Sequence, residues 1–140
     1  MYHKVIIMGN LGRDPEMRYT PDGTPVTEFS VATNYRRKRP DGTQIDETTW
    51  FRVTAWRQLA ELCNQYLSKG RQVFVEGRIK SDENGGPRVW TGNDGQPRAS
   101  FEVTANTVKF LGGRGEGEVD SSVSLQEPPP AEIGEDEIPF

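Results

Sequence analysis

Apolar and polar side chains alternate with a period of two in several stretches of the chain, as in extended strands with two different faces. A short apolar run predicts a first strand over residues 4–10, and alternation predicts a second over residues 25–35. The same pattern returns in residues 73–80 and 99–111, which predict two further strands. The strongest alternation lies between the second and third of these strands, in residues 48–56.

The strand expected over residues 48–56 has an unusual pair of faces. Its apolar face, suited to a core, consists of Phe51, Val53 and Ala55. Its other face consists of Trp50, Arg52, Thr54 and Trp56. Exposed aromatic rings are uncommon unless something binds them, and rings interleaved with cations suit single-stranded nucleic acid, whose bases stack and whose phosphates pair with Arg or Lys. The alternative is that both faces are buried, in a central strand or a subunit interface.

Pro-Asp-Gly occurs at residues 21–23 and again at 40–42, and both are turn signals because proline sets one φ while glycine permits a positive one. The second turn joins two strands into a long hairpin with Tyr35 near its tip. Four consecutive cations follow Tyr35, namely Arg36, Arg37, Lys38 and Arg39. They are interpreted either as a tip that contacts phosphates or as a solvated run of charge.

Beyond residue 56 the period changes to that of a helix. One apolar stripe recurs at intervals of three and four residues: Leu59, Leu62, Cys63, Tyr66 and Leu67. We expect Lys69 to lie in the last helical turn and Gly70 to form a left-handed C-terminal cap. Cys63 lies on the stripe and is therefore assigned to the core.

The last two strands are separated by a polar stretch at residues 82–87 and a turn signal at 93–95. Trp90 lies on this excursion, between Arg88 and Arg98. A tryptophan there has little core available to it, so base stacking with flanking cations is the interpretation that fits it best.

The order of elements is strand, strand, strand, helix, strand, strand. Five alternating strands can close into a small barrel whose end is covered by one helix, which is the oligonucleotide/oligosaccharide-binding (OB) architecture. In that architecture the face of strands two and three and the loops one–two and four–five bind the ligand. We therefore predict an all-β, five-stranded OB-fold barrel over residues 1–111, with one helix between strands three and four and a disordered acidic C-terminal tail.

Charge divides the 140-residue chain in two. Residues 1–110 hold 16 Lys and Arg against 13 Asp and Glu, a net charge of +3, whereas residues 111–140 hold one Arg against eight acids, a net charge of −7. We expect residues 112–134, rich in Gly, Ser, Pro and Glu, to be a disordered linker. The chain ends in an acidic tip, Glu135, Asp136, Glu137, Ile138, Pro139 and Phe140. This tip is either a short peptide that fills apolar pockets of a partner with a basic surface, or an arbitrary terminus.

Catalysis is not expected, because no Ser/His/Asp set, no metal-ligand cluster around the single His3 and no cofactor motif is present. Gly9 and Gly12 lack the lysine and helix of a phosphate-binding loop and are interpreted as glycines of tight turns. Cys63 is the only cysteine, which favours a reducing compartment. No apolar run is long enough to cross a membrane and no signal segment is visible, so a cytoplasmic location is expected.

Several blocks of the sequence resemble the bacterial single-stranded DNA-binding proteins (SSB). They are residues 4–19, 49–53, 59–62, 66–70, 72–77 and 135–140. The resemblance implies an OB-fold homotetramer that wraps and protects single-stranded DNA, independently of sequence, during replication, recombination and repair. It implies no catalysis, a nucleoid-associated protein of the bacterial cytoplasm, and a C-terminal tip that recruits DNA-metabolic enzymes.

The resemblance also carries over individual positions. The stacking aromatics of the family match Trp50, Trp56 and Trp90, its basic groove positions match Arg52 and Lys80, and its second hairpin matches residues 35–39. This chain departs from the family by having Trp56 where Phe is more usual, by lacking a tryptophan in the hairpin, and by an apparent insertion at residues 82–87. The alternative function is an OB-fold accessory subunit of a replication-restart or RNA-binding complex.

Overall fold

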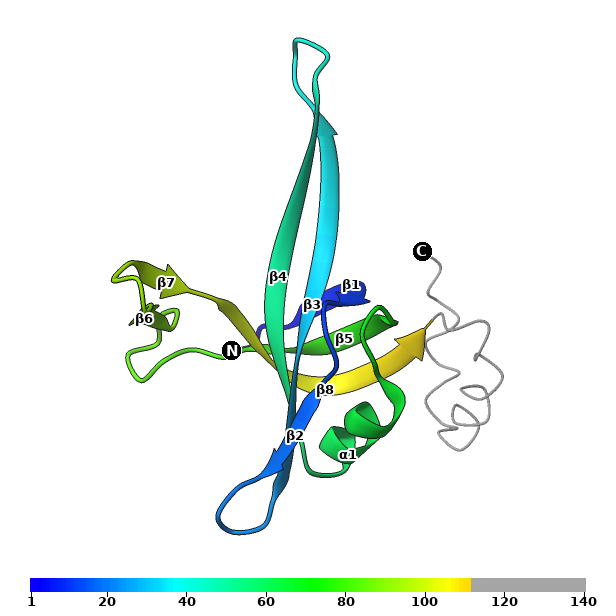
Figure 1. Ribbon diagram of the computed structural model, residues 1–140, viewed down its shortest axis with the longest axis vertical. Helices are drawn as coiled ribbons and strands as arrows, with labels where there is room; N and C mark the ends of the chain where they lie inside the picture. Colours follow the sequence, from blue (N-terminus) through cyan, green and yellow to red (C-terminus); the bar gives the residue numbers. More distant parts are fainter. Residues whose placement is uncertain (112–140) are drawn as a thin grey trace.

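The computed structural model describes residues 1–111, so the expected linker and the acidic tip lie outside the described part of the chain. The elements follow one another as β1 (Val5–Leu11), β2 (Glu16–Tyr19), β3 (Pro25–Lys38), β4 (Gln44–Trp56), α1 (Arg57–Tyr66), β5 (Gln72–Ile79), β6 (Val89–Thr91), β7 (Pro97–Ala99) and β8 (Phe101–Leu111) (Figure 1). The strands that alternation predicted correspond to β1, β3, β4, β5 and β8.

Five of these strands close into a barrel. Their order is β1-β5-β8-β4-β3, and β1 returns to β3 through the pairs Asn10–Ala32 and Leu11–Val31. Every pair in the barrel is antiparallel except β4 with β8. The helix α1 joins β4 to β5 and packs at one end of the barrel (Figure 1). The predicted OB-fold barrel with one helix between its third and fourth strands is confirmed.

The barrel interior is filled by the inward residues of the alternating strands. The buried apolar residues include Ile7, Leu11, Phe29, Val31, Val53, Ala55, Val73, Val75, Val103 and Ala105. Helix α1 adds Ala60 and Cys63, and the Thr27 hydroxyl on β3 donates a 2.7 Å hydrogen bond to the carbonyl oxygen of Ala60. Burial of this apolar surface is the main force that closes the barrel and fixes which face of β3 and β4 points outward.

Strand β8 changes face half way along its length. Asn106 is an extra residue in its pairing with β5, and such a bulge shifts the alternation by one residue. Val108 and Phe110 therefore pack against the core together with Val103. Uninterrupted alternation predicts Val108 on the outward face, and that prediction is wrong.

The helix ends earlier than the sequence pattern predicts. Its last residue is Tyr66, and Leu67 is already extended, with φ −98° and ψ 152°, while its side chain is buried. Gly70 does have a positive φ of 87°, but it lies in a separate turn in which Arg71 N donates to the Ser68 carbonyl. The prediction that Lys69 lies in the helix and Gly70 caps it is wrong, because the apolar stripe continues in extended chain.

Gly9 and Gly12 are not the glycines of tight turns, and neither has a positive φ. Gly9 lies within β1, where a Cβ would overlap the backbone carbonyl of Ala32 on the paired strand. Gly12 follows β1, and a Cβ there would overlap a tryptophan ring described below. Both glycines permit close approach of another group, which the sequence pattern does not distinguish from a turn.

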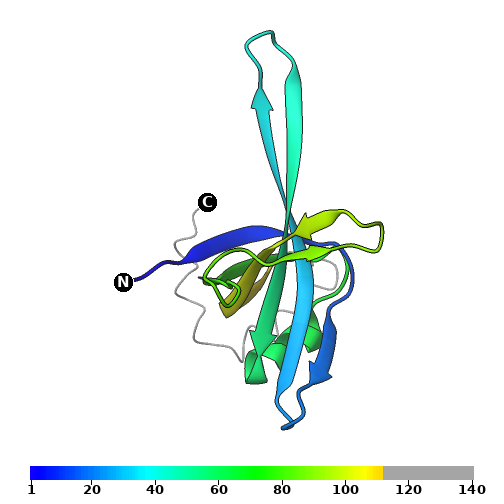
Figure 2. The same cartoon turned by 90° about the vertical axis from the view of Figure 1, so that its left-hand side faces the viewer.

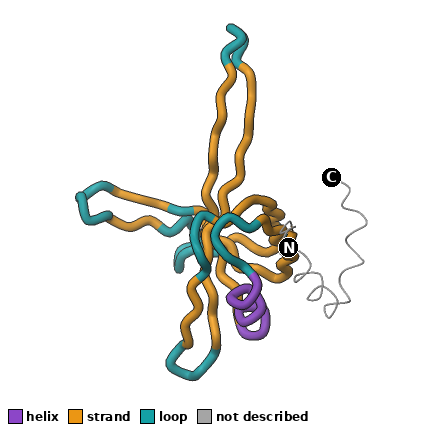
Figure 3. The backbone as a smooth tube through the Cα atoms, turned by 45° about the vertical axis from the view of Figure 1, so that its right-hand side comes forward, coloured by secondary structure: helices purple, strands orange, loops and turns teal. Residues whose placement is uncertain are grey.

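Three projections extend from the barrel (Figure 3). The longest is the β3–β4 hairpin, whose predicted turn is closed by the hydrogen bonds Arg39 N to Thr43 O and Gly42 N to Arg39 O. The second is the β6–β7 hairpin, seen toward the viewer in Figure 2, which occupies the excursion around Trp90. The third is the β2–β3 turn. Strands β2, β6 and β7 are too short for alternation to reveal them.

Candidate nucleic-acid interface

The outward face of β4 carries the residues that the sequence singles out. Trp50 is 51% exposed and Trp56 is 38% exposed, whereas Val53 and Ala55 on the opposite face are buried. Burial of both faces inside the barrel is therefore excluded. The two tryptophans are six positions apart, which on an extended strand corresponds to about 20 Å.

Trp50 packs against the backbone of Gly12 while half of its surface stays accessible. A Cβ at residue 12 would come within 2.5 Å of ring carbon Cζ3 and 2.7 Å of Cη2. The Gly12 N–H also donates to the Ser30 carbonyl at 3.1 Å, which fixes this backbone segment against β3. The absence of a side chain at Gly12 therefore permits the Trp50 ring to lie against this backbone, a role that a lone glycine in the sequence does not reveal.

Arg52 lies between the two rings and is half-buried. It is paired with Ser30 across the β3–β4 ladder. It also lines a small depression of about 40 Å³ together with Glu16 and Glu28. The Arg52 side chain thus lies in a depression that carboxylates and the further cation Arg13 also line, so the charges around it are mixed.

Arg52 is also adjacent to Glu102, its partner in the parallel β4–β8 pairing. Glu102 is only 6% exposed, yet its oxygens are well satisfied. Arg88 Nη1 lies 3.1 Å from Oε2, the Ser100 hydroxyl donates to Oε2 at 3.0 Å, and Lys80 Nζ lies 3.9 Å from Oε1. Two predicted DNA-binding cations, Lys80 and Arg88, are therefore gathered on one carboxylate.

The surroundings of Glu102 keep it ionised. Burial alone would raise the pKa of this carboxyl, but hydrogen bonds from Ser100 and Arg88 and the charges of Lys80 and Arg88 hold the pKa below its ordinary value. The sequence offers no signal for this role, because Glu102 alternates like any outward polar residue of a strand.

The ring of Trp90 is connected to this carboxylate through Arg88. The guanidinium carbon of Arg88 lies 4.8 Å from the Trp90 ring centroid, within the range of a cation–π contact. Trp90 is half-buried and is paired with Arg98 across the β6–β7 hairpin. The structure thus brings Trp90, Arg88, Lys80 and, through Glu102, the β4 face into one neighbourhood.

The tip of the β3–β4 hairpin is organised differently. Tyr35 is 63% exposed there. Arg36 Nε lies 2.8 Å from Asp46 Oδ1, and Arg37 Nη2 lies 2.9 Å from Glu47 Oε2, in two exposed cross-strand ion pairs. Lys38 and Arg39 form no ion pair with any residue of the described chain, 1–111. The four cations are therefore two paired and two unpaired charges, a division that the sequence pattern does not show.

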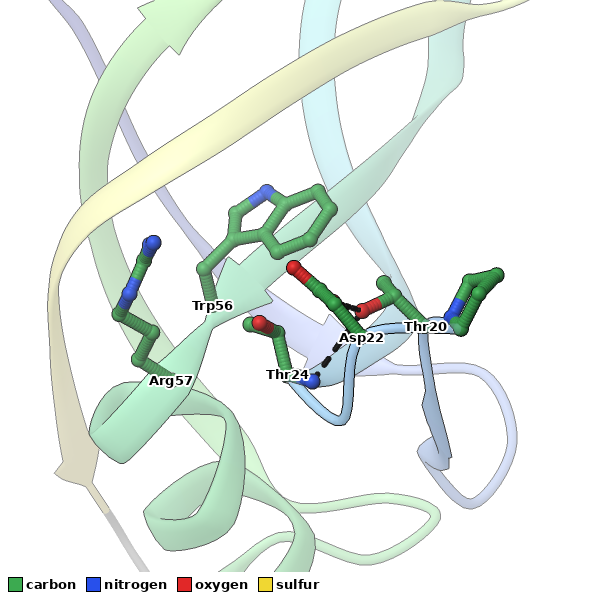
Figure 4. A pocket seen from close by; sticks show the side chains of 6 residues that line it. Thr20, Asp22, Thr24, Trp56 and Arg57 are labelled. Carbon is green, nitrogen blue, oxygen red and sulfur yellow. Dashed lines mark hydrogen bonds between the residues drawn. The ribbon is translucent and has the colours of Figure 1, made fainter.

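Trp56 lies in an open hollow at the far end of β4, shown in Figure 4. The hollow, of about 650 Å³, is lined by Thr20, Pro21, Asp22, Thr24, Trp56 and Arg57, and we call it the Trp56 hollow. Arg57 begins α1 directly after Trp56 with a φ of 55°. Sequence reasoning missed Arg57 and Asp22. The signals available were a cation next to a tryptophan at a strand–helix junction and the first Pro-Asp-Gly turn.

The remaining candidate groups have structural roles. His3 Nε2 accepts a 2.9 Å hydrogen bond from the Ile79 N–H. Cys63 is fully buried as expected, and burial raises the pKa of its thiol to about 12. Within residues 1–111 no cluster of three or more His, Cys, Asp or Glu could hold a metal ion. In the same residues no helix has the length and apolar character needed to cross a membrane.

Known proteins similar to this chain carry names that refer to single-stranded DNA. The model of the single-strand binding protein family matches residues 2–111. A single-stranded DNA-binding protein of Neisseria meningitidis is 46% identical over 114 residues, which cover 81% of this chain and 62% of that protein. One of Xanthomonas axonopodis is 44% identical over 115 residues, covering 82% of this chain and 61% of its own length. The matches thus span less than two thirds of these relatives.

Solved structures agree with the sequence matches. The crystal structure of the small single-stranded DNA-binding protein of Streptomyces coelicolor is similar with a TM-score of 0.64 and 28% identity, covering 78% of this chain and 94% of that one. A deletion mutant of the Thermus aquaticus single-stranded DNA binding protein gives a TM-score of 0.63 with 30% identity, covering 80% and 51% of the two chains. By its barrel and by the match over residues 2–111, the chain belongs to the single-strand binding protein family.

Proposed function

We propose that this protein binds single-stranded DNA without sequence requirement along the outward face of β4. The observation that carries the proposal is the row of exposed Trp50, half-buried Arg52 and exposed Trp56 on one strand face. Bases stacked on such rings each contribute about 1–3 kcal/mol, and a stacked ring accepts any base. The +3 net charge of residues 1–110 supports attraction of the phosphates.

The proposed path of the strand continues beyond β4. Arg88 and Trp90 on the β6–β7 side, next to Lys80, offer a further ring and further cations close to Arg52. Lys38 and Arg39 at the tip of the β3–β4 hairpin would add phosphate contacts at a distance from the rings. A strand that reaches both projections must bend around the barrel, which is a physical basis for wrapping.

Family membership and the sequence support a proposal for the cellular role. We infer a homotetramer that protects single-stranded DNA during replication, recombination and repair in the bacterial cytoplasm, associated with the nucleoid. Residues 135–140 are proposed to recruit DNA-metabolic enzymes, with Ile138 and Phe140 filling apolar pockets and the acids steering the tip to basic surfaces. Deletion of these six residues should abolish capture of such enzymes and leave DNA binding intact.

The decisive test is a tryptophan fluorescence titration with oligo(dT) at two salt concentrations, on the wild type and on Trp50→Ala. We expect strong quenching, weaker affinity at higher salt, and a loss of affinity of about tenfold in the variant. Tyr2→Ala, which removes an exposed aromatic ring outside the interface, is the matched control. Absence of quenching in the wild type would refute the proposal.

A comparison of matched ribo- and deoxyribo-oligomers separates this function from that of an RNA-binding accessory subunit. We expect the deoxyribo-oligomer to bind at least as tightly, because the proposed contacts are to base faces and phosphates, and none is assigned to a 2′-hydroxyl. Clear preference for the ribo-oligomer would favour the alternative.

A further inference from the structure

The Trp56 hollow combines three kinds of group around one aromatic ring (Figure 4). The indole of Trp56 stands between Arg57 on one side and the β2–β3 turn, with Asp22 and Thr20, on the other. A ring, a cation and a hydrogen-bonding edge are the complement of a nucleotide, which offers a base face, a phosphate and a base edge.

Internal hydrogen bonds limit what the β2–β3 turn can offer to a ligand. The Thr20 hydroxyl donates to Asp22 Oδ1 and accepts from the Thr24 N–H at 3.1 Å, so its single proton is already used. Hydrogen bonds from Thr20 and Thr24 lower the pKa of Asp22, which keeps its carboxylate ionised. These hydrogen bonds do not exhaust the carboxylate, because its two oxygens together offer about four lone pairs. The free polar group of the turn is therefore an acceptor.

Arg57 lies beside Trp56 in an energetically unfavourable backbone conformation. It is the only non-glycine residue with a positive φ in the described part of the chain. Such conformations are disfavoured for residues with a Cβ, and they recur at functional sites where the surroundings maintain them. The strained backbone lets β4 enter α1 without a loop, and it directs a cation to the rim of the hollow. With Asp22 opposite, the hollow offers a cation for a phosphate and a carboxylate that can accept a hydrogen bond from a base.

We propose that the Trp56 hollow binds one nucleotide of the strand and prefers a base with an exocyclic amino group. The base stacks on Trp56, its amino group donates to the Asp22 carboxylate, and its phosphate pairs with Arg57. Cytosine, adenine and guanine offer such an amino group on their pairing edge, whereas thymine offers one N–H between two carbonyl oxygens that the carboxylate repels. The inference rests on the proposed function and adds a local base preference to a sequence-tolerant interface.

The sharpest test compares two oligonucleotides that differ only at this edge. Oligomers of 5-methyldeoxycytidine and of thymidine share the methyl group and differ in the amino or carbonyl group at position 4, together with the ring nitrogen beside it. With the full-length chain and oligomers of about ten nucleotides, within the span of one OB fold, we expect the 5-methylcytosine oligomer to bind about three- to tenfold more tightly.

Asp22→Asn should reduce this preference to less than about twofold, because an amide can rotate to donate to the thymine carbonyl and lacks the charge-assisted bond. The matched control is Asp41→Asn in the other Pro-Asp-Gly turn. Asp41 likewise accepts from the backbone of the threonine two residues on, at 2.9 Å, but no tryptophan lines its surroundings. This control should keep the full preference, even if loss of one negative charge raises affinity for both oligomers.

Arg57→Gly separates the phosphate contact from the base contact. Glycine accepts the positive φ, so the fold should persist, and both oligomers should lose affinity by the same factor with the preference intact. Retention of the preference by Asp22→Asn, or its loss in Arg57→Gly, would overturn the inference.

The result also separates this inference from the proposed function. Equal binding of both oligomers by the wild type, with tryptophan quenching still present, overturns the base preference alone. Failure of both oligomers to bind or to quench overturns the proposed function itself.

Discussion

The two hairpins that leave the barrel both carry an aromatic ring and cations, but they are held in different ways. In the β6–β7 hairpin, Arg88 contacts the Trp90 ring and reaches the nearly buried Glu102 at its base. At the β3–β4 tip, Arg36 pairs with Asp46 across the ladder, and both side chains are largely exposed. The β6–β7 hairpin is connected to the barrel by an ion pair with the nearly buried Glu102, whereas the ion pairs of the β3–β4 tip join only its own two strands.

This difference indicates that the two hairpins contribute to DNA binding in different ways. A cation bonded to a carboxylate of low exposure holds a defined position, because breaking the pair leaves a poorly solvated charge. Exposed ion pairs contribute little and exchange readily with solvent. We therefore expect the β6–β7 side to offer Trp90 in a fixed position for stacking, and the β3–β4 tip to act through charge.

The largest effect is expected from removing the protected carboxylate. Glu102→Gln should lower the free energy of unfolding by about 2 kcal/mol, since Arg88 and Lys80 lose a charged partner that is shielded from water. Asp46→Asn, which breaks an ion pair of the other hairpin, should cost less than about 0.5 kcal/mol. Urea denaturation of both variants measures the contrast, and equal losses would mean that the two hairpins are held alike.

A smaller effect is expected on DNA affinity when the aromatic ring of each hairpin, Trp90 or Tyr35, is removed. Trp90→Ala should weaken affinity for oligo(dT) about tenfold, close to 1.4 kcal/mol, because a ring already fixed in place loses little freedom on stacking. Tyr35→Ala, at the exposed tip, should weaken it less than about threefold. Fluorescence anisotropy with a labelled oligomer reports both. A larger loss of affinity in Tyr35→Ala than in Trp90→Ala would contradict the proposed roles of the two hairpins.

Acid should loosen the attachment of the β6–β7 hairpin through Glu102. The pKa of Glu102 is lower in the folded protein than its ordinary value, so its stabilising contribution is fully present above the ordinary glutamate pKa. That contribution is lost as the pH falls through the lowered pKa of the folded state. Unfolding measured across this acidic range should show a slope that Glu102→Gln reduces. An unchanged slope in the variant would assign the acid sensitivity elsewhere.

The smallest effect concerns the paired and unpaired cations of the tip. Lys38→Ala should reduce the slope of log affinity against log salt by up to about 0.7, the value for one phosphate contact on a single strand. Arg36→Ala should change it less, because Arg36 already has Asp46 as a counterion. Titrations at four salt concentrations would measure both slopes. Equal changes would indicate that the ion pair opens when DNA binds.

Alternation predicted the barrel well because it depends on local sequence. The two faces of β4 could be assigned from Phe51 to Trp56 alone, since a strand with one buried face must alternate. The bulge at Asn106 could not be predicted this way, because nothing in the local pattern marks the extra residue. Strand β2 was missed for a related reason, since four residues are too few to establish a period.

The sequence predicted individual residues of the site but not the contacts between them. The rings and cations stand out as residue types, so Trp90 and Arg88 were found. Glu102 was not, because its importance arises only when the parallel β4–β8 pair places it next to Arg52 and beneath Arg88. The strained Arg57 was missed since its φ is fixed by the junction of strand and helix rather than by its own preference.

The parallel pairing of β4 with β8 has a consequence for how the molecule folds. It joins Phe51 to Phe101, fifty positions apart, whereas the turn of the β3–β4 hairpin joins Lys38 to Gln44. Distant contacts form late because a long loop must be closed first. We expect pulse-labelled hydrogen exchange during refolding to protect the hairpin amides before those of β8, and simultaneous protection would contradict this order. The nascent chain would then expose its tryptophans before the barrel exists to support them, which makes the unfinished molecule prone to self-association.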